Sequence, residues 1–169
     1  MAPKPDRPPR FRFRNPGRRI DGDLQLVLVK KSPADPVKNY SSAYTFEMRK
    51  AGKQRKIGGI RLRIGRQRSL AGFCGHIGYN VDAQHRGHHY AARSCRLLFP
   101  LAFAHGIRTL WITCDPKNLA SRRTCELAGG VYVNTVRVPK GTELYASGRR
   151  RVRRYRFDLR KLLGEMERR

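Results

Sequence analysis

The segment from residue 84 to 94, QHRGHHYAARS, gathers residue types that could do chemistry. The adjacent His88 and His89 could bind a metal ion. Alternatively, the backbone from Arg86 to Ala91 could offer N–H groups to a phosphate, because a helix N-terminus attracts anions. Gly87 would let the backbone approach such a ligand closely. Since no cysteine or acidic residue stands near the histidines at metal-ligand spacing, we favour the phosphate and expect no metal.

The neighbouring segments are the elements that a phosphate site needs. Residues 73–81 alternate between apolar and polar side chains, which predicts a half-buried strand. Residues 89–105 are rich in Ala, Leu and Arg and stop at Gly106, which predicts a helix with a kink near Pro100. This strand–loop–helix order places the basic loop at a helix N-terminus.

The remaining pattern predicts an α/β (α+β) fold with a mixed, mostly antiparallel sheet of about seven strands. The segment from strand 73–81 to strand 109–114 is a βαβ crossover, so these two strands should be parallel. A short helix should begin at the N-cap Asn118 and end at Gly129-Gly130. The other expected strands are residues 23–30, 43–50, 56–65, 131–138 and 153–159.

The composition is strongly basic, with a formal net charge of +26 and a pI near 11.3. We predict a Pro/Arg-rich disordered tail at 1–20, one domain at 21–160 and a basic C-terminal tail at 161–169. Such a charge attracts polyanions, so RNA or the ribosome could contact the tails. Because the four cysteines fit no zinc template and no apolar run could span a bilayer, we expect a reduced, cytoplasmic protein without membrane contact.

Two motifs carry a resemblance to a known family. The first is Val81-Asp82-Ala83 followed by QHRGHHYA before a helix, and the second is WITCDPKNLASRRTCELAGG. In this order, they resemble the signature blocks of the GCN5-related N-acetyltransferase (GNAT) superfamily. The run DPKNLAS is most similar to members that acetylate protein N-termini, including those of ribosomal proteins.

The resemblance implies a GNAT fold with a central parallel pair around a cofactor cleft, and acetyl-CoA as co-substrate without a metal. The connection at residues 30–42 is short, so the family's helical region after the first strand should be reduced. The resemblance also implies a cofactor site. Its expected residues are Asn80, Val81, Arg86, Gly87, His88, His89, Tyr90, Ala91, Asn118 and Ser121.

The chain departs from the family pattern where the catalytic groups are expected. Cys125 occupies the place of a common tyrosine acid, and it is either a thiol acid or a small buried residue. No glutamate lies on strand 73–81, so His76 is a candidate base, or else a hydrogen-bonded structural histidine. In the loop 139–150, Tyr145 and Glu143 could contact the acceptor, or the loop could be plain surface.

Two functions follow as expectations. The first is an acetyl-CoA-dependent N-acetyltransferase that acts by direct attack of a primary amine of a small molecule or a protein. The alternative is a GNAT-like module, non-catalytic or weakly catalytic, that binds RNA or the ribosome through its basic surface. The positive charge disfavours polyamine acceptors and favours an acidic or neutral amine. We expect a monomer or a homodimer.

Overall fold

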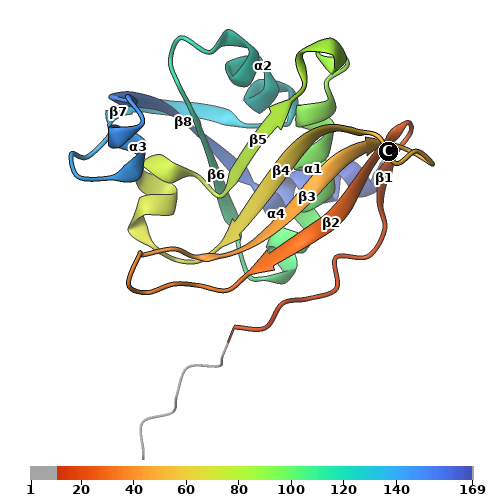
Figure 1. Ribbon diagram of the computed structural model, residues 1–169, viewed down its shortest axis with the longest axis horizontal. Coiled ribbons are helices and arrows are strands. Elements are labelled where there is room, and N and C mark those ends of the chain that lie inside the picture. Colours follow the sequence, from red (N-terminus) through yellow and green to blue (C-terminus); the bar gives the residue numbers. More distant parts are fainter. Residues whose placement is uncertain (1–10, 169) are drawn as a thin grey trace, which may run out of the picture.

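The computed structural model describes residues 11–168, which form two antiparallel sheets with helices beside them (Figure 1). The first sheet has five strands, hydrogen-bonded in chain order. They are β1 (Arg19–Asp21), β2 (Leu24–Ser32), β3 (Ser42–Lys50), β4 (Lys56–Ile64) and β5 (Ile77–Val81). The second sheet has the order β6 (Thr109–Cys114), β8 (Arg151–Asp158), β7 (Val131–Arg137). All paired neighbours are antiparallel.

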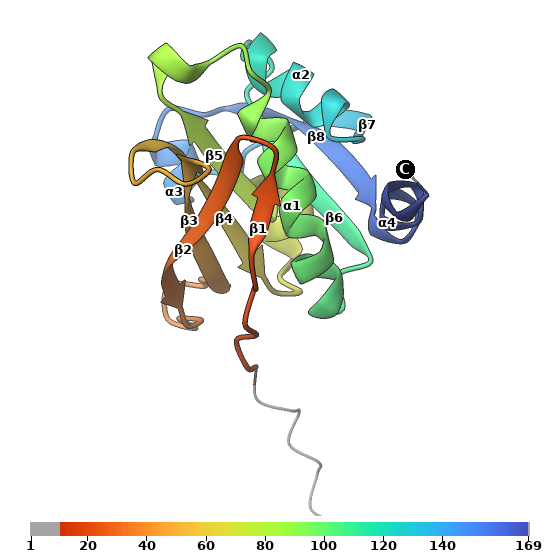
Figure 2. The ribbon, with the colours of Figure 1, turned by 90° about the vertical axis from the view of Figure 1, so that its right-hand side faces the viewer.

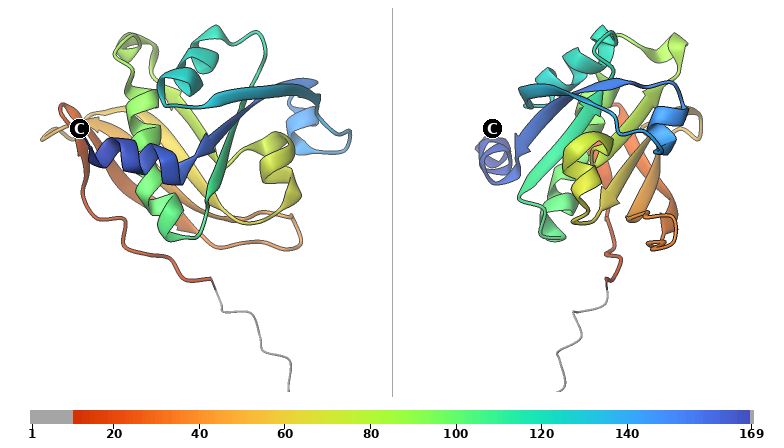
Figure 3. Two further views of the ribbon diagram at one scale, coloured as in Figure 1. Left: turned by 180° about the vertical axis from the view of Figure 1, so that it is seen from behind. Right: turned by 90° about the vertical axis from the view of Figure 1, so that its left-hand side faces the viewer.

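Four α-helices and two short helices complete the fold. They are α1 (Tyr90–Ala104), α2 (Leu119–Leu127), α3 (Glu143–Ala146), α4 (Leu159–Glu167), the π-helix η1 (Leu70–Cys74) and the 3-10 helix η2 (Ala83–His85). Helix α1 lies between the five-stranded sheet and α4 (Figure 2). Seen from behind, α1 and α4 lie on the same side of that sheet (Figure 3). No helix in the described part is long and apolar enough to cross a membrane.

The core lies where α1 meets the first sheet, and strand alternation explains its composition. On β4, Ile60 and Leu62 are buried against this helix, whereas Arg61 and Arg63 are on the opposite face. The buried residues of α1 that join this core include Cys95, Leu98 and Phe99. The fold class predicted from the pattern, a mixed and mostly antiparallel α/β arrangement, is confirmed.

Strands β5 and β6, the expected parallel pair, are neighbours without a regular ladder. Near the start of β5, the backbone N–H of His76 donates to the carbonyl of Trp111 at 2.7 Å. Beyond this point the strands diverge toward η2 and α2 (Figure 1). The expected single sheet is therefore divided into two sheets, with eight strands because β1 was not predicted.

The predicted N-terminal tail is wrong for its second half. Residues 19–21 form β1, and the ring of Phe13 packs edge-on against Tyr44 with 5.1 Å between centroids. The ring of Phe11 stacks on His105, with centroids 5.2 Å apart. These aromatic contacts anchor the basic segment on the core. Residues 1–10 of the predicted tail lie outside the described residues.

The predicted basic C-terminal tail at 161–169 is helical up to Glu167, as part of α4. Asp158 caps this helix by accepting a hydrogen bond from the backbone N–H of Lys161 at 3.1 Å. Leu162 and Leu163 pack against the core. Phe13 and helix α4 therefore pack against the same hydrophobic core.

The short connection after the first predicted strand is confirmed. Between β2 and β3 the chain makes a turn closed by an isolated bridge between Asp35 and Tyr40, and this connection contains no helix. The sheet face opposite α1 is consequently bordered by this turn, η1 and α3.

Candidate active site

The loop before α1 has the geometry of an anion site. Every backbone N–H from His88 to Ala92 lacks a hydrogen-bond acceptor within the described residues, and no side chain caps the helix. Gly87 has a φ of +88°, and a Cβ placed there would contact nothing within 4 Å. These N–H groups can therefore bind a phosphate from the N-terminus of a 15-residue helix.

His89 adopts the left-handed conformation, with φ +58°, that usually favours glycine. The imidazole is exposed and accepts no capping hydrogen bond. The backbone of this histidine is therefore glycine-like. This geometry explains why the helix begins at Tyr90.

Arg86 lies at the rim of the loop but not in the run of free N–H groups. Its backbone N–H donates to Ala83 O at 3.3 Å, and its side-chain Nε donates to Val81 O at 3.0 Å. The structure thus leaves the exposed guanidinium, and not the amide, available to a ligand.

An ion-pair network missed by the sequence analysis fixes this loop. The buried Tyr90 donates its hydroxyl to Asp23 Oδ2 at 2.6 Å, and Arg93 contacts Asp21 at 2.8 Å and Asp23 at 2.9 Å. Lys50 also contacts Asp23, at 2.8 Å, and together with Tyr90 and Arg93 it lowers the pKa of that carboxyl. The β1–β2 hairpin is therefore tied to the first turn of α1, and Tyr90 can offer only its N–H to a ligand.

The edge of β5 that faces the gap between β5 and β6 exposes the backbone groups of alternate residues. Asp82 N–H donates to Ile57 O of β4 at 2.9 Å. Because alternate residues of a strand face opposite neighbours, Asn80 also directs its backbone to β4, and Tyr79 and Val81 direct theirs to the gap. The predicted backbone role therefore fits Val81 but not Asn80, and Tyr79 replaces it.

His76 does not have the geometry of a general base. Its Nδ1 accepts a hydrogen bond from the Trp111 N–H at 3.0 Å, so the proton of the neutral ring lies on Nε2. Burial lowers the pKa of His76 to about 4. Since the hydrogen-bonded ring has no free lone pair, the base role is corrected to a structural one that joins β5 to β6.

The predicted acid, Cys125, lies in a buried cluster between β5, β6 and α2. Its Sγ is 3.8 Å from the Tyr79 hydroxyl, which is 2.8 Å from Ser121 Oγ. The hydrogen bond with Cys114 and burial raise the pKa of Cys125. The same contact lowers the pKa of Cys114 to about 7. Cys125 is thus a protonated thiol next to a hydroxyl pair.

The two residues predicted from α2 to contact the cofactor have structural partners. Asn118 caps the helix, because its Oδ1 accepts from the Ser121 N–H at 3.0 Å. Ser121 contacts the Tyr79 hydroxyl with both its Oγ and its carbonyl, so it links α2 to β5. Asn118 is exposed and Ser121 is half-buried.

On the other side of the sheet, the structure brings Glu143 of α3 to the turn after β2, where the Tyr40 hydroxyl donates to its carboxylate. Tyr145 packs its ring under the Arg150 guanidinium, 3.8 Å from the ring centroid. Neither residue reaches the α1 loop in a contact within the described chain. They form part of the wall on the face opposite α1.

A cavity of about 810 Å³ lies near the contact between β5 and β6. His76 and Trp111 form part of its wall, and Arg66 and Arg108 contribute positive charge. Within residues 11–168, no group of three or more His, Cys, Asp or Glu side chains could bind a metal.

The comparisons agree with this geometry. The profile of the acetyltransferase (GNAT) domain matches residues 22–131. The ribosomal-protein-S5-alanine acetyltransferase of Vibrio fischeri is similar in structure, with a TM-score of 0.61 and 14% identity, covering 83% of this chain and 96% of that one. A search of curated protein sequences finds no match.

Two further solved structures share the fold. The ribosomal L7/L12 alpha-N-protein acetyltransferase RimL has a TM-score of 0.52 and 17% identity, covering 69% of this chain and 70% of that one. The microcin C7 self-immunity acetyltransferase MccE, in complex with acetyl-CoA and AMP, has a TM-score of 0.51 and 16% identity over 69% of this chain. The chain spans 61% of the length of MccE.

The free N–H groups before α1 and the separation of β5 from β6 lie within an acetyltransferase (GNAT) domain. The chain belongs to the GNAT family and is an N-acetyltransferase.

Proposed function

We propose that the chain binds acetyl-CoA through the loop before α1 and transfers the acetyl group directly to a primary amine of a small molecule or a protein. The run of free N–H groups from His88 to Ala92 carries this proposal. Gly87 permits close approach, and Arg86 supplies charge at the rim. When bound, the cofactor supplies an activated acetyl thioester.

The residues of the gap would position the reacting groups. The N–H groups of Tyr79 and Val81, which face away from β4, can polarise a carbonyl placed along the β5 edge. Cys125 is the candidate acid, with the hydroxyls of Tyr79 and Ser121 next to it. No covalent enzyme intermediate is required if both substrates are aligned in the gap.

The test is calorimetric titration with acetyl-CoA, followed by thiol release with a panel of amine acceptors. We expect 1:1 binding and acceptor-dependent release of coenzyme A. Cys125→Ala should lower kcat without changing the Kd of acetyl-CoA, and Cys125→Ser should recover part of the rate. Absence of acetyl-CoA binding by the folded chain would overturn the proposal.

One observation favours a second candidate function, RNA or ribosome binding. Strand β8 carries Arg151, Arg153, Arg154 and Arg156, and none of them contacts a carboxylate in the described chain. Arg151 also lies directly opposite Arg137 of β7, a like-charge pairing that destabilises a sheet. Solved structures that share the fold include ribosomal-protein acetyltransferases, which is consistent with a ribosomal acceptor.

This second candidate predicts a steep salt dependence of RNA affinity. Gel-shift titrations at increasing salt would measure it, with the double variant Arg151→Gln/Arg156→Gln expected to flatten the dependence. An RNA affinity that is insensitive to salt and to these substitutions would exclude this surface.

A further inference from the structure

Two arginines of β4 share an open face of the sheet. Arg61 lies opposite Gly78 of β5, and the N–H of Arg63 donates to His76 O at 2.7 Å. Both side chains are half-buried on the face opposite α1. Because Gly78 has no side chain, the guanidinium of Arg63 can lie over it, beside the edge where β5 leaves β6.

Neither guanidinium has a carboxylate partner in the described chain. Nη1 of Arg63 donates only to Gly75 O at 3.5 Å, and Nε of Arg61 is buried without any partner. The Arg63 guanidinium also lies 3.6 Å from the position of a Cβ on Gly78. Two adjacent, partly desolvated cations without a counter-charge are unfavourable, and an anionic ligand would relieve this arrangement.

The nearest acidic side chains on this face have other partners. Glu47 pairs with Arg49 at 2.6 Å, and Glu143 accepts from the Tyr40 hydroxyl. Burial lowers the pKa of Arg63, and the charge of Arg61 lowers it further. Neither cation therefore forms an ion pair with these two carboxylates.

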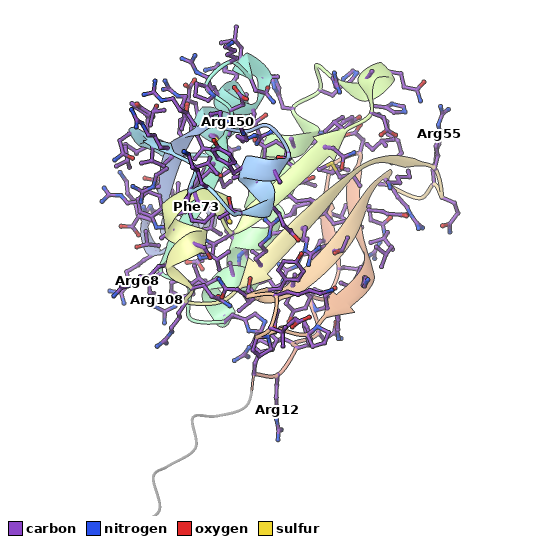
Figure 4. The ribbon with its side chains drawn as sticks, turned by 60° about the vertical axis from the view of Figure 1, so that its left-hand side comes forward. Arg12, Arg55, Arg68, Phe73, Arg108 and Arg150 are labelled. Atoms are coloured by element: carbon purple, nitrogen blue, oxygen red, sulfur yellow. The ribbon has the colours of Figure 1, made fainter. Side chains whose placement is uncertain are left out.

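This face is also where an acetyl acceptor would approach. The opposite face of β4 and β5 is covered by α1, whose N-terminus carries the anion loop. The open face is bordered by η1, α3 and the turn after β2. Figure 4 shows Phe73 of η1 and Arg150 after α3 on this side, with Arg68 and Arg108 below them.

We propose that Arg61 and Arg63 bind a carboxylate of the acetyl acceptor, so that the acceptor is an amine with acidic groups near the reacting nitrogen. This inference rests on the proposed acetyl transfer and names its substrate class. A polyamine or a lysine-rich peptide would meet repulsion from the same two side chains. A peptide with an acidic N-terminal segment, or an acidic amino acid, supplies the required charge.

The experiment compares three short peptides that share an N-terminal Ser and differ in their next residues: Asp-Glu, Asn-Gln or Lys-Lys. Free glutamate is added to separate a small acid from an acidic peptide. Thiol release at saturating acetyl-CoA should show a kcat/KM about 10-fold higher for the acidic than for the neutral peptide, mostly through KM. The lysine peptide should be the poorest of the three.

Variants assign this preference to the two arginines. Arg63→Ala and Arg61→Ala should each lower kcat/KM for the acidic peptide about 10-fold and change the neutral peptide little. Arg63→Lys keeps the positive charge and should restore part of the preference for the acidic peptide. This recovery would show that the loss in Arg63→Ala does not come from misfolding. Arg55→Ala, at the tip of the β3–β4 hairpin away from this face (Figure 4), is the matched control and should behave as wild type.

Fluorescence anisotropy with labelled peptides, without acetyl-CoA, separates this inference from the proposed function. Tighter binding of the acidic peptide that is lost in the Arg61→Ala/Arg63→Ala double variant supports the inference even if no acetyl transfer occurs. Equal binding of acidic and neutral peptides, or an equal effect of the variants on both, overturns it. Failure of acetyl-CoA titration overturns only the proposed function.

Discussion

The two sides of the β5–β6 gap use different parts of the chain. On the α1 side, the candidate anion site is backbone, formed by consecutive N–H groups from His88 to Ala92. On the opposite side, the wall is made of side chains from β4, η1, α3 and the turn after β2. A backbone site binds phosphates whatever side chains surround it, whereas a wall of side chains can change its acceptor through single substitutions.

The two sides also differ in whether their positively charged side chains form ion pairs. Near the anion loop, Lys50 and Arg93 are both paired with Asp23. On the acceptor side, Arg61 and Arg63 have no acidic partner in the described chain. Apart from Arg86 at the rim, charge beside the loop therefore serves the fold, and charge on the open face is left for a ligand.

The largest expected effect breaks the backbone site alone. Gly87→Val should abolish acetyl-CoA binding, lowering the affinity at least about 100-fold, because a β-branched residue is strained at the φ of +88°. Since the added side chain meets nothing within 4 Å, the fold should be retained. Titration calorimetry measures the affinity, and circular dichroism checks the fold.

Gly52→Val is the matched control, because Gly52 also has a positive φ, of +73°, and open space around it, but lies in the β3–β4 hairpin. It should strain its own turn and leave acetyl-CoA binding intact. Equal affinities of the Gly87 and Gly52 variants would show that the loop before α1 is not the cofactor site.

The next effect concerns the histidine that joins the two sheets. The pKa of His76 is about 4 in the fold against an ordinary value of 6.5, so the unfolded chain binds more protons between these values. The neutral ring therefore contributes about 3 kcal/mol to the free energy of unfolding. This contribution is complete above pH 6.5 and is lost as the pH falls toward 4. The melting temperature should therefore decrease as the pH is lowered from 7 to 4.5.

His76→Asn tests this assignment, since an amide oxygen can accept from Trp111 N–H without titrating. The variant should melt near the wild-type temperature at pH 7 and lose much of the decline toward pH 4.5. His76→Leu lacks the acceptor and should be destabilised at both values. An unchanged pH slope in the asparagine variant would contradict the structural role.

The contrast between the two sides also explains which parts of the site could be predicted from the sequence. The loop from Arg86 to Ala91 was predicted because its glycine, its helix and its strand are contiguous. The carboxylates of Asp21 and Asp23 were missed because they meet Arg93 and Tyr90 only after folding. No local sequence pattern indicates a contact between residues this far apart in the chain.

Two further predictions failed for a related reason. The Pro/Arg content of residues 11–18 indicated disorder, but Phe11 and Phe13 pack their rings against His105 and Tyr44. The base role of His76 failed because its ring partner, Trp111, lies on a different strand. The residue type indicated possible chemistry, and the tertiary hydrogen bond removed it.

A smaller effect sharpens the role of the network beside the loop. Tyr90→Phe removes the hydroxyl that donates to Asp23 at 2.6 Å and should destabilise the fold by about 1 kcal/mol. It should also weaken acetyl-CoA binding a few-fold, because the first turn of α1 is less well fixed. Urea unfolding and calorimetry measure the two effects.

Tyr132→Phe is the control for this prediction, because its hydroxyl is 3.0 Å from Thr135 on the exposed strand β7. It should change neither acetyl-CoA binding nor, by more than a few tenths of a kcal/mol, stability. If the two phenylalanine variants were indistinguishable, the network would not support the loop.

The smallest effect separates backbone from side chain at the anion site. His89→Gly should raise stability by up to about 0.5 kcal/mol, because relief of the left-handed strain at φ +58° is partly offset by the greater freedom of glycine in the unfolded chain. Acetyl-CoA affinity should stay within about twofold of wild type, since the N–H at this position is kept. Thermal melts and calorimetry measure both quantities, with His88→Gly as a neighbour that lacks a positive φ. A large loss of affinity in His89→Gly would make the imidazole a ligand, and the loop would then bind through a side chain as the acceptor face does.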